Sequence, residues 1–315
     1  MESLGSLLKS IPDPAYLRKA EQIRQELLAD PLIVKWRQKY PQVTDEDIRL
    51  NLNKLYQYVR EMKQCANCPG LDNCPNDLEG HYTMLSADAA GGSHIYDNKV
   101  ACRKFTARQS QQMISSRIRS FYVDDHALQH GYAVDEIVKN DVERVKAVGQ
   151  VLDYILLTKE KGLQRKGLYL EGKFGTGKTF LMCYMLHELA VTGYTGAIVY
   201  MPDFVEDLKG MFGEPQKLKE TIDLLKETDL LVLDDIGAEN MNPWLRDHVL
   251  AAILNYRMNR KPTFFTSNYE LDTLEQHFSF TSKDGEEELK GQRLMDRIRP
   301  FVEVVYVNGR NKRGA

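Results

Sequence analysis

The chain has 315 residues, enough for two ordinary domains, and its 43% hydrophobic and 28% charged residues are typical of a globular protein. The formal net charge of −3 excludes no class of partner, because a local basic patch can bind phosphate on a nearly neutral protein. There is no run of about 18 apolar residues and no apolar stretch after a basic start. We therefore expect a cytoplasmic protein with no membrane segment.

Apolar residues recur at helical spacing between residues 13 and 63, for example at Leu52, Leu55 and Val59. This spacing is typical of amphipathic helices that face a core. Pro41 interrupts the pattern. We therefore predict two or three helices here, whose apolar faces pack on one another.

Four of the five cysteines follow in a segment rich in Gly and Pro. Cys65, Cys68 and Cys74 are spaced C-x2-C-x5-C, and His81 and Cys102 come later. Cytosolic cysteines stay reduced, and structural zinc takes four thiolate or imidazole ligands. The spacing predicts a zinc site of the three cysteines with His81, or with Cys102 as the alternative fourth ligand. Free thiols and a redox pair are the competing interpretations.

The middle of the chain contains a change of pattern. Residues 104–122 are basic and helical in pattern, residues 123–135 are typical of a linker, and a helical pattern resumes near Glu136. We therefore predict an N-terminal, mainly helical zinc-binding domain over residues 1–122, a linker over 123–135 and a second domain over 136–315.

Short apolar runs alternate with helical patterns beyond Gly167. The runs cover residues 168–170, 197–200, 230–233 and 263–266. Continuous apolar strands are typical of a parallel sheet buried on both faces. Alternating strands and helices therefore predict an α/β domain with helices on both sides of a parallel sheet.

A phosphate-binding loop follows the first of these runs. Residues 172–179, GKFGTGKT, match G-x-x-x-x-G-K-[ST] in full, between an apolar strand and a helical pattern. The glycines let backbone N–H groups point at phosphate oxygens, Lys178 reaches the β- and γ-phosphates, and the Thr179 hydroxyl binds Mg²⁺. The motif predicts an ATP site formed by Gly172, Lys173, Phe174, Gly175, Thr176, Gly177, Lys178, Thr179 and Phe180.

Two carboxylates, Asp234 and Asp235, end the apolar run at 230–233. We expect Asp234 to hold the shell of Mg²⁺ and Asp235 to orient and activate the attacking water. Further on, Arg293 and Arg297 are four residues apart and would share one face of a helix. We expect Arg297 to stabilise charge on the γ-phosphate of ATP bound in a neighbouring subunit, with Arg293 as the alternative. A solvated basic helix with a local contact to Asp296 is the alternative.

These features resemble the AAA+ class of P-loop ATPases. The resemblance implies that Asn268, at the end of the run at 263–266, hydrogen-bonds the γ-phosphate or the attacking water. Many members of the class have Glu at the position where this chain has the shorter Asp235. Few residues follow Arg299, which favours a reduced or absent helical lid.

The whole chain resembles the bacterial replicative helicase loaders of the DnaI type. The motifs are LNKLYQYV, the cysteine spacing and LEGH on the N-terminal side, and GKFGTGKTF, LLVLDDIGAE, the WLRD run at 244–247, PTFFTSN and RLMDRI on the C-terminal side. The resemblance implies an ATPase that loads a hexameric replicative helicase onto single-stranded DNA during primosome assembly. It also implies that the N-terminal half docks on the helicase, and that subunits associate when bound to ATP or helicase. Other primosome proteins are further candidate partners.

Several assignments stay open. The family has an E-G-Y-H-like context where this chain has EGHY at 79–82, so the fourth zinc ligand is undecided. An IstB-type transposase helper and an ATP-switched adaptor without significant turnover are the alternative functions. Candidate DNA contacts are Arg165, Lys166, Lys209, Arg257, Arg260 and Lys261. Tyr200 and Phe204 could serve as stacking platforms, but core packing is the favoured role for both.

Overall fold

The structure is a computed structural model that describes residues 21–22, 24–88, 94–121, 123, 142–281 and 285–311. The chain divides into two compact units, Met1–Ser110 and Gln111–Ala315. Residues 13–20 of the predicted helical segment lie outside the described residues, as does the predicted linker apart from Val123. The domain boundaries at 122 and 136 therefore stay predictions.

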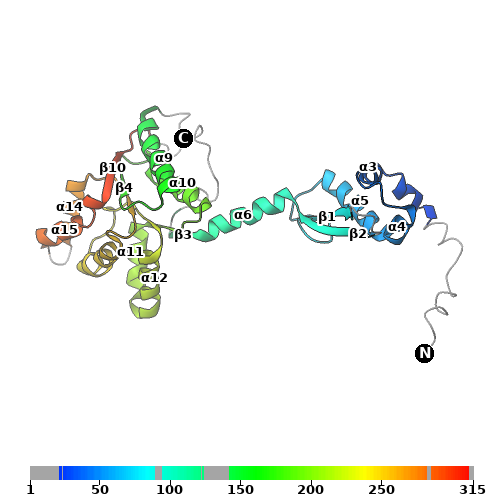
Figure 1. Ribbon diagram of the computed structural model, residues 1–315. Helices are drawn as coiled ribbons and strands as arrows, with labels where there is room; N and C mark the ends of the chain where they lie inside the picture. Colours follow the sequence, from blue (N-terminus) through cyan, green and yellow to red (C-terminus); the bar gives the residue numbers. More distant parts are fainter. Residues whose placement is uncertain are drawn as a thin grey trace. The chain divides into compact units, whose positions relative to one another are not determined.

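The N-terminal unit packs short helices against a β-hairpin (Figure 1). Its elements are α3 (Pro31–Lys39), α4 (Asp45–Leu50), α5 (Leu52–Ala66), β1 (His81–Ala87) and β2 (Ile95–Ala101), with β1 and β2 antiparallel. Asp30 caps α3, and Thr44 begins α4 with a reciprocal capping box. Ile33, Ile48 and Leu55 are fully buried in one apolar cluster. The predicted helices pack on one another, as expected from their apolar spacing.

Glu61 of α5 is buried in this unit, with only 1% of its surface exposed. Its carboxylate accepts hydrogen bonds from the Thr83 backbone N–H and from Lys99 Nζ, both at 2.5 Å. Burial alone would raise the pKa of Glu61, but the hydrogen bonds from Lys99 and Thr83 lower it below its usual value. This carboxylate therefore joins α5 to both strands of the hairpin.

We expect Glu61→Ala to lower the free energy of unfolding of the N-terminal unit by about 2–4 kcal/mol near neutral pH, because the buried Thr83 N–H loses its acceptor. Since the folded-state pKa is depressed, the contribution is complete above about pH 4.3 and is lost as the pH falls through the folded-state pKa. Hydrogen exchange of the β1 and β2 amides measures this change in the free energy of unfolding. Glu46→Ala, which removes an exposed pair with Arg49, is the control and should change little.

Helix α6 (Arg103–Arg117) is shorter than its sequence predicts. The predicted helical stretch to residue 122 is wrong beyond Arg117, because Ile118–Phe121 forms strand β3 and pairs in parallel with β5. Pairing with a sheet overrides the local helical pattern. The strand lies inside the predicted N-terminal domain, yet it is the edge strand of the C-terminal sheet.

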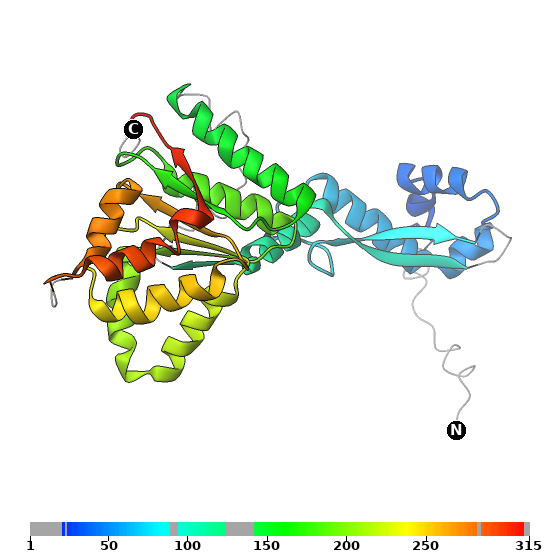
Figure 2. The ribbon, with the colours of Figure 1, turned by 60° about the vertical axis from the view of Figure 1, so that its left-hand side comes forward.

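The C-terminal unit is built on a parallel sheet, which has six strands among the described residues, in the order β10-β4-β7-β6-β5-β3 (Figure 2). Its remaining strands are β4 (Gly167–Glu171), β5 (Gly196–Tyr200), β6 (Leu230–Asp234), β7 (Thr263–Ser267) and β10 (Val302–Tyr306). Alternate residues of each strand join opposite apolar clusters, as Leu170 and Tyr169 do in β4. The predicted α/β fold is confirmed.

Helices cover both faces of the sheet (Figures 1 and 2). One apolar cluster contains residues of α9 (Val145–Lys161) and α10 (Lys178–Val191). The other contains residues of α11 (Met201–Gly210), α12 (Pro215–Glu227), α13 (Ala251–Arg257), α14 (Leu271–Ser279) and α15 (Glu288–Met295). Shorter segments are η1 (Val142–Arg144), η2 (Met211–Gly213), the π-helical η3 (Leu245–Leu250), η4 (Arg299–Phe301), β8 (Phe280–Thr281) and β9 (Gly285–Glu286). In the part of the chain that the structure describes, no helix is both long and apolar enough to span a membrane.

Candidate nucleotide-binding site

The predicted ATP-site residues meet at one edge of the sheet, where β4, β6 and β7 end. The phosphate loop follows β4, the two aspartates follow β6, and Asn268 follows β7. Ligands of open parallel sheets bind beyond the carboxyl ends of the strands. A cavity of ≈ 280 Å³ lies here, lined by residues 174–175 and 177–180 of the loop together with Tyr200, Asp234, Asp235, Thr266 and Asn268.

The phosphate loop adopts the tight curve that its glycines predict. Gly175 and Gly177 have φ of 74° and 89°, in the left-handed region that other residues rarely adopt. Lys178 begins α10 and is almost fully buried. Its Nζ donates to the carbonyls of Gly172 at 2.8 Å and Lys173 at 3.0 Å. The ammonium group therefore lies over the loop, where it can bind phosphate oxygens.

Asp234 is held by two hydroxyl groups and is 2% exposed. Thr179 Oγ1 donates to one carboxylate oxygen at 3.1 Å, and Thr266 Oγ1 donates to the other at 2.6 Å. Burial raises the pKa of Asp234 despite these bonds. A nearby cation would favour the ionised carboxylate, and hydroxyl and carboxylate oxygens are ligands that suit Mg²⁺. The hydroxyl oxygen of Thr179 and the carboxylate oxygens of Asp234 therefore suit Mg²⁺ as ligands.

Asn268 connects the loop lysine with the second carboxylate. Its Oδ1 accepts from Lys178 Nζ at 2.8 Å, and its Nδ2 donates to Asp235 Oδ1 at 2.9 Å. Asp235 has a φ of 54°, a left-handed conformation that is uncommon outside glycine and typical of constrained functional sites. This backbone turn places the Asp235 carboxylate on the cavity.

Thr266 is a site residue that the motifs did not identify. Besides its bond to Asp234, its Oγ1 accepts the Asp235 N–H at 2.9 Å, so one hydroxyl fixes both aspartates. The available signal was a polar residue within the apolar β7, two positions before Asn268. Its side chain shares a strand face with that asparagine because strand residues alternate.

The arginines in and after α15 do not line this cavity. We predicted from their spacing that Arg293 and Arg297 share one helix. This prediction is wrong, because α15 ends at Met295, between the two arginines. Arg297 follows in a turn, and its guanidinium donates to the Arg293 carbonyl. Arg299 is bound within the chain by Asp272 at 2.7 Å and Glu275 at 2.9 Å. The described residues that line the nucleotide cavity include neither Arg293 nor Arg297.

The four N-terminal cysteines each accept a hydrogen bond from nitrogen. The donors are Asn76 to Cys65, Lys104 to Cys68, Gly80 to Cys74 and Phe105 to Cys102, at 3.3–3.5 Å. The backbone N–H of Gly70 lowers the pKa of the Cys68 thiol, with a further contribution from Lys104. Such N–H donors stabilise thiolates, the form that binds zinc.

Their arrangement does not itself form a metal site: among the described residues, no three His, Cys, Asp or Glu side chains are placed to hold an ion. Gly80 bonds to both Cys74 and Cys102, donating to the first sulfur and accepting the backbone N–H of the second. His81 is bound to the Glu79 carbonyl at 2.9 Å and packs on Phe105. Gly80 thus connects the Cys74 sulfur with the backbone of Cys102, while the His81 ring is bound to the Glu79 carbonyl.

Two of the candidate DNA contacts are wrong. Arg257 is 1% exposed, and its guanidinium donates to backbone carbonyls including those of Thr228 and Pro262. Burial lowers the pKa of Arg257 to about 10. Phe204 is buried in the core and cannot stack on a base. The burial of Arg257 was not recognisable from its charge, whereas Phe204 packs in the core as its favoured role predicts.

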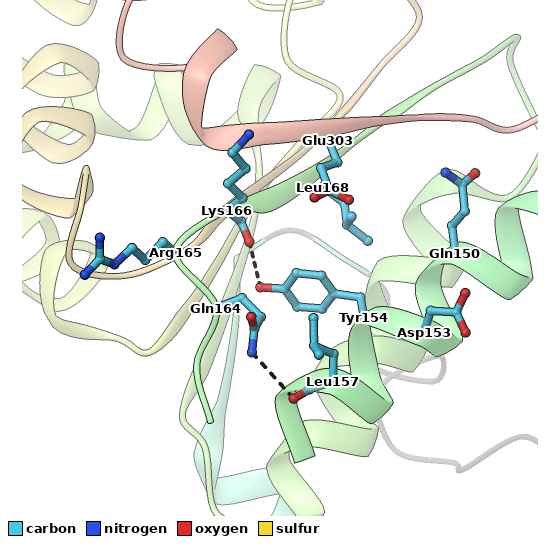
Figure 3. A pocket seen from close by; sticks show the side chains of 9 residues that line it. All are labelled: Gln150, Asp153, Tyr154, Leu157, Gln164, Arg165, Lys166, Leu168 and Glu303. Carbon is cyan, nitrogen blue, oxygen red and sulfur yellow. Dashed lines mark hydrogen bonds between the residues drawn. The ribbon is translucent and has the colours of Figure 1, made fainter. Parts of the chain in front are cut away.

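Arg165 and Lys166 lie at the opposite edge of the sheet from the nucleotide cavity, before the start of β4. They line a second cavity, of ≈ 490 Å³, together with α9 and Glu303 of β10 (Figure 3). Tyr154 donates to the Lys166 carbonyl across it. Carboxylates of Asp153 and Glu303 border the same cavity, so its charge is mixed (Figure 3).

The strand order β10-β4-β7-β6-β5, with a phosphate loop after β4, an acidic pair after β6 and an asparagine after β7, defines a P-loop protein of the AAA+ class. Over 99% of its length the chain is 35% identical to the replicative helicase loader DnaI of Bacillus subtilis (strain 168), and the match covers 99% of that protein. The chain therefore belongs to the DnaI family of replicative helicase loaders.

Other comparisons agree with this assignment. Residues 1–91 match the family model of the primosomal protein DnaI N-terminus, and residues 158–314 match that of IstB-like ATP-binding proteins. A crystal structure of DnaI is 32% identical with a TM-score of 0.51, covering 65% of this chain and 99% of its own. A putative primosome component from Streptococcus pyogenes serotype M3 is 33% identical with a TM-score of 0.51, covering 64% and 98%.

Proposed function

We propose that this chain is an ATP-dependent loader of the hexameric replicative helicase onto single-stranded DNA, acting in the cytoplasm during primosome assembly. The observation that carries the proposal is the similarity to a replicative helicase loader over 99% of both chains. The nucleotide cavity supports it, because Lys178, Thr179, Asp234, Asp235 and Asn268 all line this one cavity.

Hydrolysis of ATP to ADP and phosphate follows from the same side chains. Lys178 and the loop amides would bind the β- and γ-phosphates, and Thr179 with Asp234 would hold Mg²⁺, which offsets charge on the phosphates. Asp235 would orient the attacking water and accept its proton, and Asn268 would fix Asp235 relative to Lys178. Arg297 of a neighbouring subunit would complete the site.

Native mass spectrometry of the chain mixed with the host's hexameric replicative helicase, with and without ATP, tests the loader function. We expect a defined complex that is lost when the chain starts at Gln111, since the segment matching the DnaI N-terminus is then removed. A mixture that forms no complex under any nucleotide condition would contradict the proposal. The IstB-type transposase helper would then rank first, because residues 158–314 match that family model.

Single-stranded DNA, further copies of the chain and other primosome proteins are the additional partners that we propose. Of the DNA candidates, Arg165, Lys166, Lys209 and Arg260 are exposed. Arg260 lies over the Tyr256 ring at 4.9 Å, an arrangement that also suits base stacking. An adaptor that binds ATP without turnover is the alternative, and variants of Asp235 distinguish it.

We propose further that the N-terminal unit binds one zinc ion through Cys65, Cys68 and Cys74 with Cys102 or His81. The support is chemical: four thiols, each with an N–H donor, lie in a segment with few large apolar residues. Zinc would order this segment.

We expect purified protein to contain about one zinc per chain and Cys102→Ser to lose it, because Cys102 shares Gly80 with Cys74. Elemental analysis of the purified variants measures the content. Cys183→Ser is the control, since Cys183 is buried in α10 of the other unit and should not alter it. If Cys102→Ser retains zinc and His81→Ala loses it, His81 is the fourth ligand.

A further inference from the structure

Arg246, within the WLRD run, is a buried arginine that the proposed mechanism does not use. It lies in the π-helical segment η3 and is 1% exposed. Its Nη1 donates to the Phe278 carbonyl at 3.1 Å, at the end of α14. Its Nε and Nη2 donate to Asp247, at 2.8 Å and 3.3 Å. π-helical segments are rare and frequently mark functional positions.

The same guanidinium reaches α15. Arg246 Nη2 donates to Glu287 Oε2 at 2.5 Å, and Glu287 is the N-cap residue of that helix. Lys290, in the first turn of α15, pairs with Glu287 at 2.8 Å and with Asp247 at 3.3 Å. Four alternating charges therefore join η3 to the beginning of α15.

These groups stay ionised. Burial alone would lower the pKa of Arg246, but Asp247 and Glu287 raise it on balance. Lys290 and Arg246 hold the pKa of Glu287 below its usual value. An apolar side chain of similar size would fill the space, but it could not fix the orientation of α15 relative to η3. A guanidinium can, because it makes several hydrogen bonds in one plane.

Helix α15 leads directly into the candidate arginine finger. It has eight residues, Arg293 is in its last turn, and Arg297 follows in the next turn. A cavity of ≈ 300 Å³ is lined by Arg246, Asp247 and Lys290 of the network and also by Arg293 and Arg297. The charge network and the finger candidates therefore border the same space.

We propose that Arg246 is a positioning residue for ATP hydrolysis: it anchors the start of α15, so that the arginine after this helix reaches the γ-phosphate in a neighbouring subunit. The inference rests on the proposed function of Arg297 as a finger in trans. Arg246 itself touches no nucleotide. A reacting group displaced by about 1 Å can cost about 10²-fold in rate, which is why a rigid anchor matters.

Arg246→Met tests the proposal in the full chain, in the helicase-bound assembly. We expect the rate of ATP hydrolysis to fall about 10–100-fold, while the single chain binds ATP with unchanged affinity. Glu287→Gln, at a partly exposed position, removes one charge of the network without emptying the core and should give a smaller loss. Arg257→Met is the matched control, because Arg257 is equally buried but bonds to residues 225–229 and 262–263. It should reduce stability and leave the rate per folded molecule unchanged.

Mixed assemblies separate positioning from general damage. Asp235→Asn subunits lack the catalytic carboxylate but carry an intact α15, so mixing them with Arg246→Met subunits should restore hydrolysis in the sites that pair the two. The proposal is overturned if Arg246→Met hydrolyses ATP at the wild-type rate, or if mixing restores nothing. An Arg297→Ala and Asp235→Asn mixture serves as the reference. If that mixture is restored and the Arg246→Met mixture is not, only the positioning role fails. If neither is restored, the finger in trans fails and the positioning role fails with it.

Discussion

Asp235→Asn is expected to lower the rate of ATP hydrolysis about 10²–10⁴-fold while leaving ATP affinity nearly unchanged, because the amide cannot accept a proton from the attacking water. The substitution should leave the fold intact. Asparagine tolerates the φ of 54° at this position, and its Oδ1 can still accept the hydrogen bond from Asn268 Nδ2. A lower rate of hydrolysis in this variant would therefore reflect the chemical step and not a change in fold.

The charge change also favours retained binding. The negative charge on Asp235 contributes to the raised pKa of Asp234, behind burial, so removing it eases ionisation of the carboxylate that we expect to hold Mg²⁺. Phosphate release measures turnover, and fluorescent-nucleotide titration measures affinity. Lys178→Ala is the contrasting variant, because it should weaken binding itself. Unchanged hydrolysis in Asp235→Asn would remove Asp235 from its assigned role.

The nucleotide site could be predicted from the sequence because its parts are local. The phosphate loop, the acidic pair and Asn268 each follow a recognisable apolar strand, and parallel strands bring their carboxyl ends to one edge. The role of Thr266 depends on register: only the pairing of β6 with β7 brings its hydroxyl to both aspartates. A single-sequence pattern carries no register between strands.

Burial of charge was the other feature that could not be predicted. Arg257 and Arg260 are both arginines at the end of one helical pattern, yet the first is surrounded by carbonyls and the second is exposed. Their difference depends on residues 225–229 and 262–263, which fold around Arg257 from other elements. Similarly, β3 forms only because β5 is available to pair with it. The cysteine spacing predicts a zinc site, but it does not fix which side chain would be the fourth ligand.

Arg297→Ala should lower hydrolysis in helicase-bound assemblies by about 10³-fold or more, the range in which arginine fingers act on transition-state charge. Arg299 is excluded as the finger because Asp272 and Glu275 already bind its guanidinium. Arg293 is exposed at the end of α15, whereas Arg297 donates only to the Arg293 carbonyl among the described residues, and its Nε has no hydrogen-bond partner there. The Arg297 guanidinium pairs with no carboxylate among the described residues, unlike that of Arg299.

The single chain should bind ATP with the same affinity after Arg297→Ala, because its own cavity is lined by residues from other elements. If Arg297 acts in a neighbouring subunit, nucleotide titration of the isolated chain should show unchanged affinity, while the assembly should show slower hydrolysis. Arg293→Ala is the matched comparison, with a loss of less than about tenfold expected if Arg297 is the finger. Equal loss of binding and turnover in Arg297→Ala would place the residue in a structural role. A turnover defect confined to Arg293→Ala would assign the finger role to Arg293. The anchoring of α15 by Arg246 would then apply to Arg293 unchanged, since Arg293 lies in the last turn of this helix and Arg297 directly follows it.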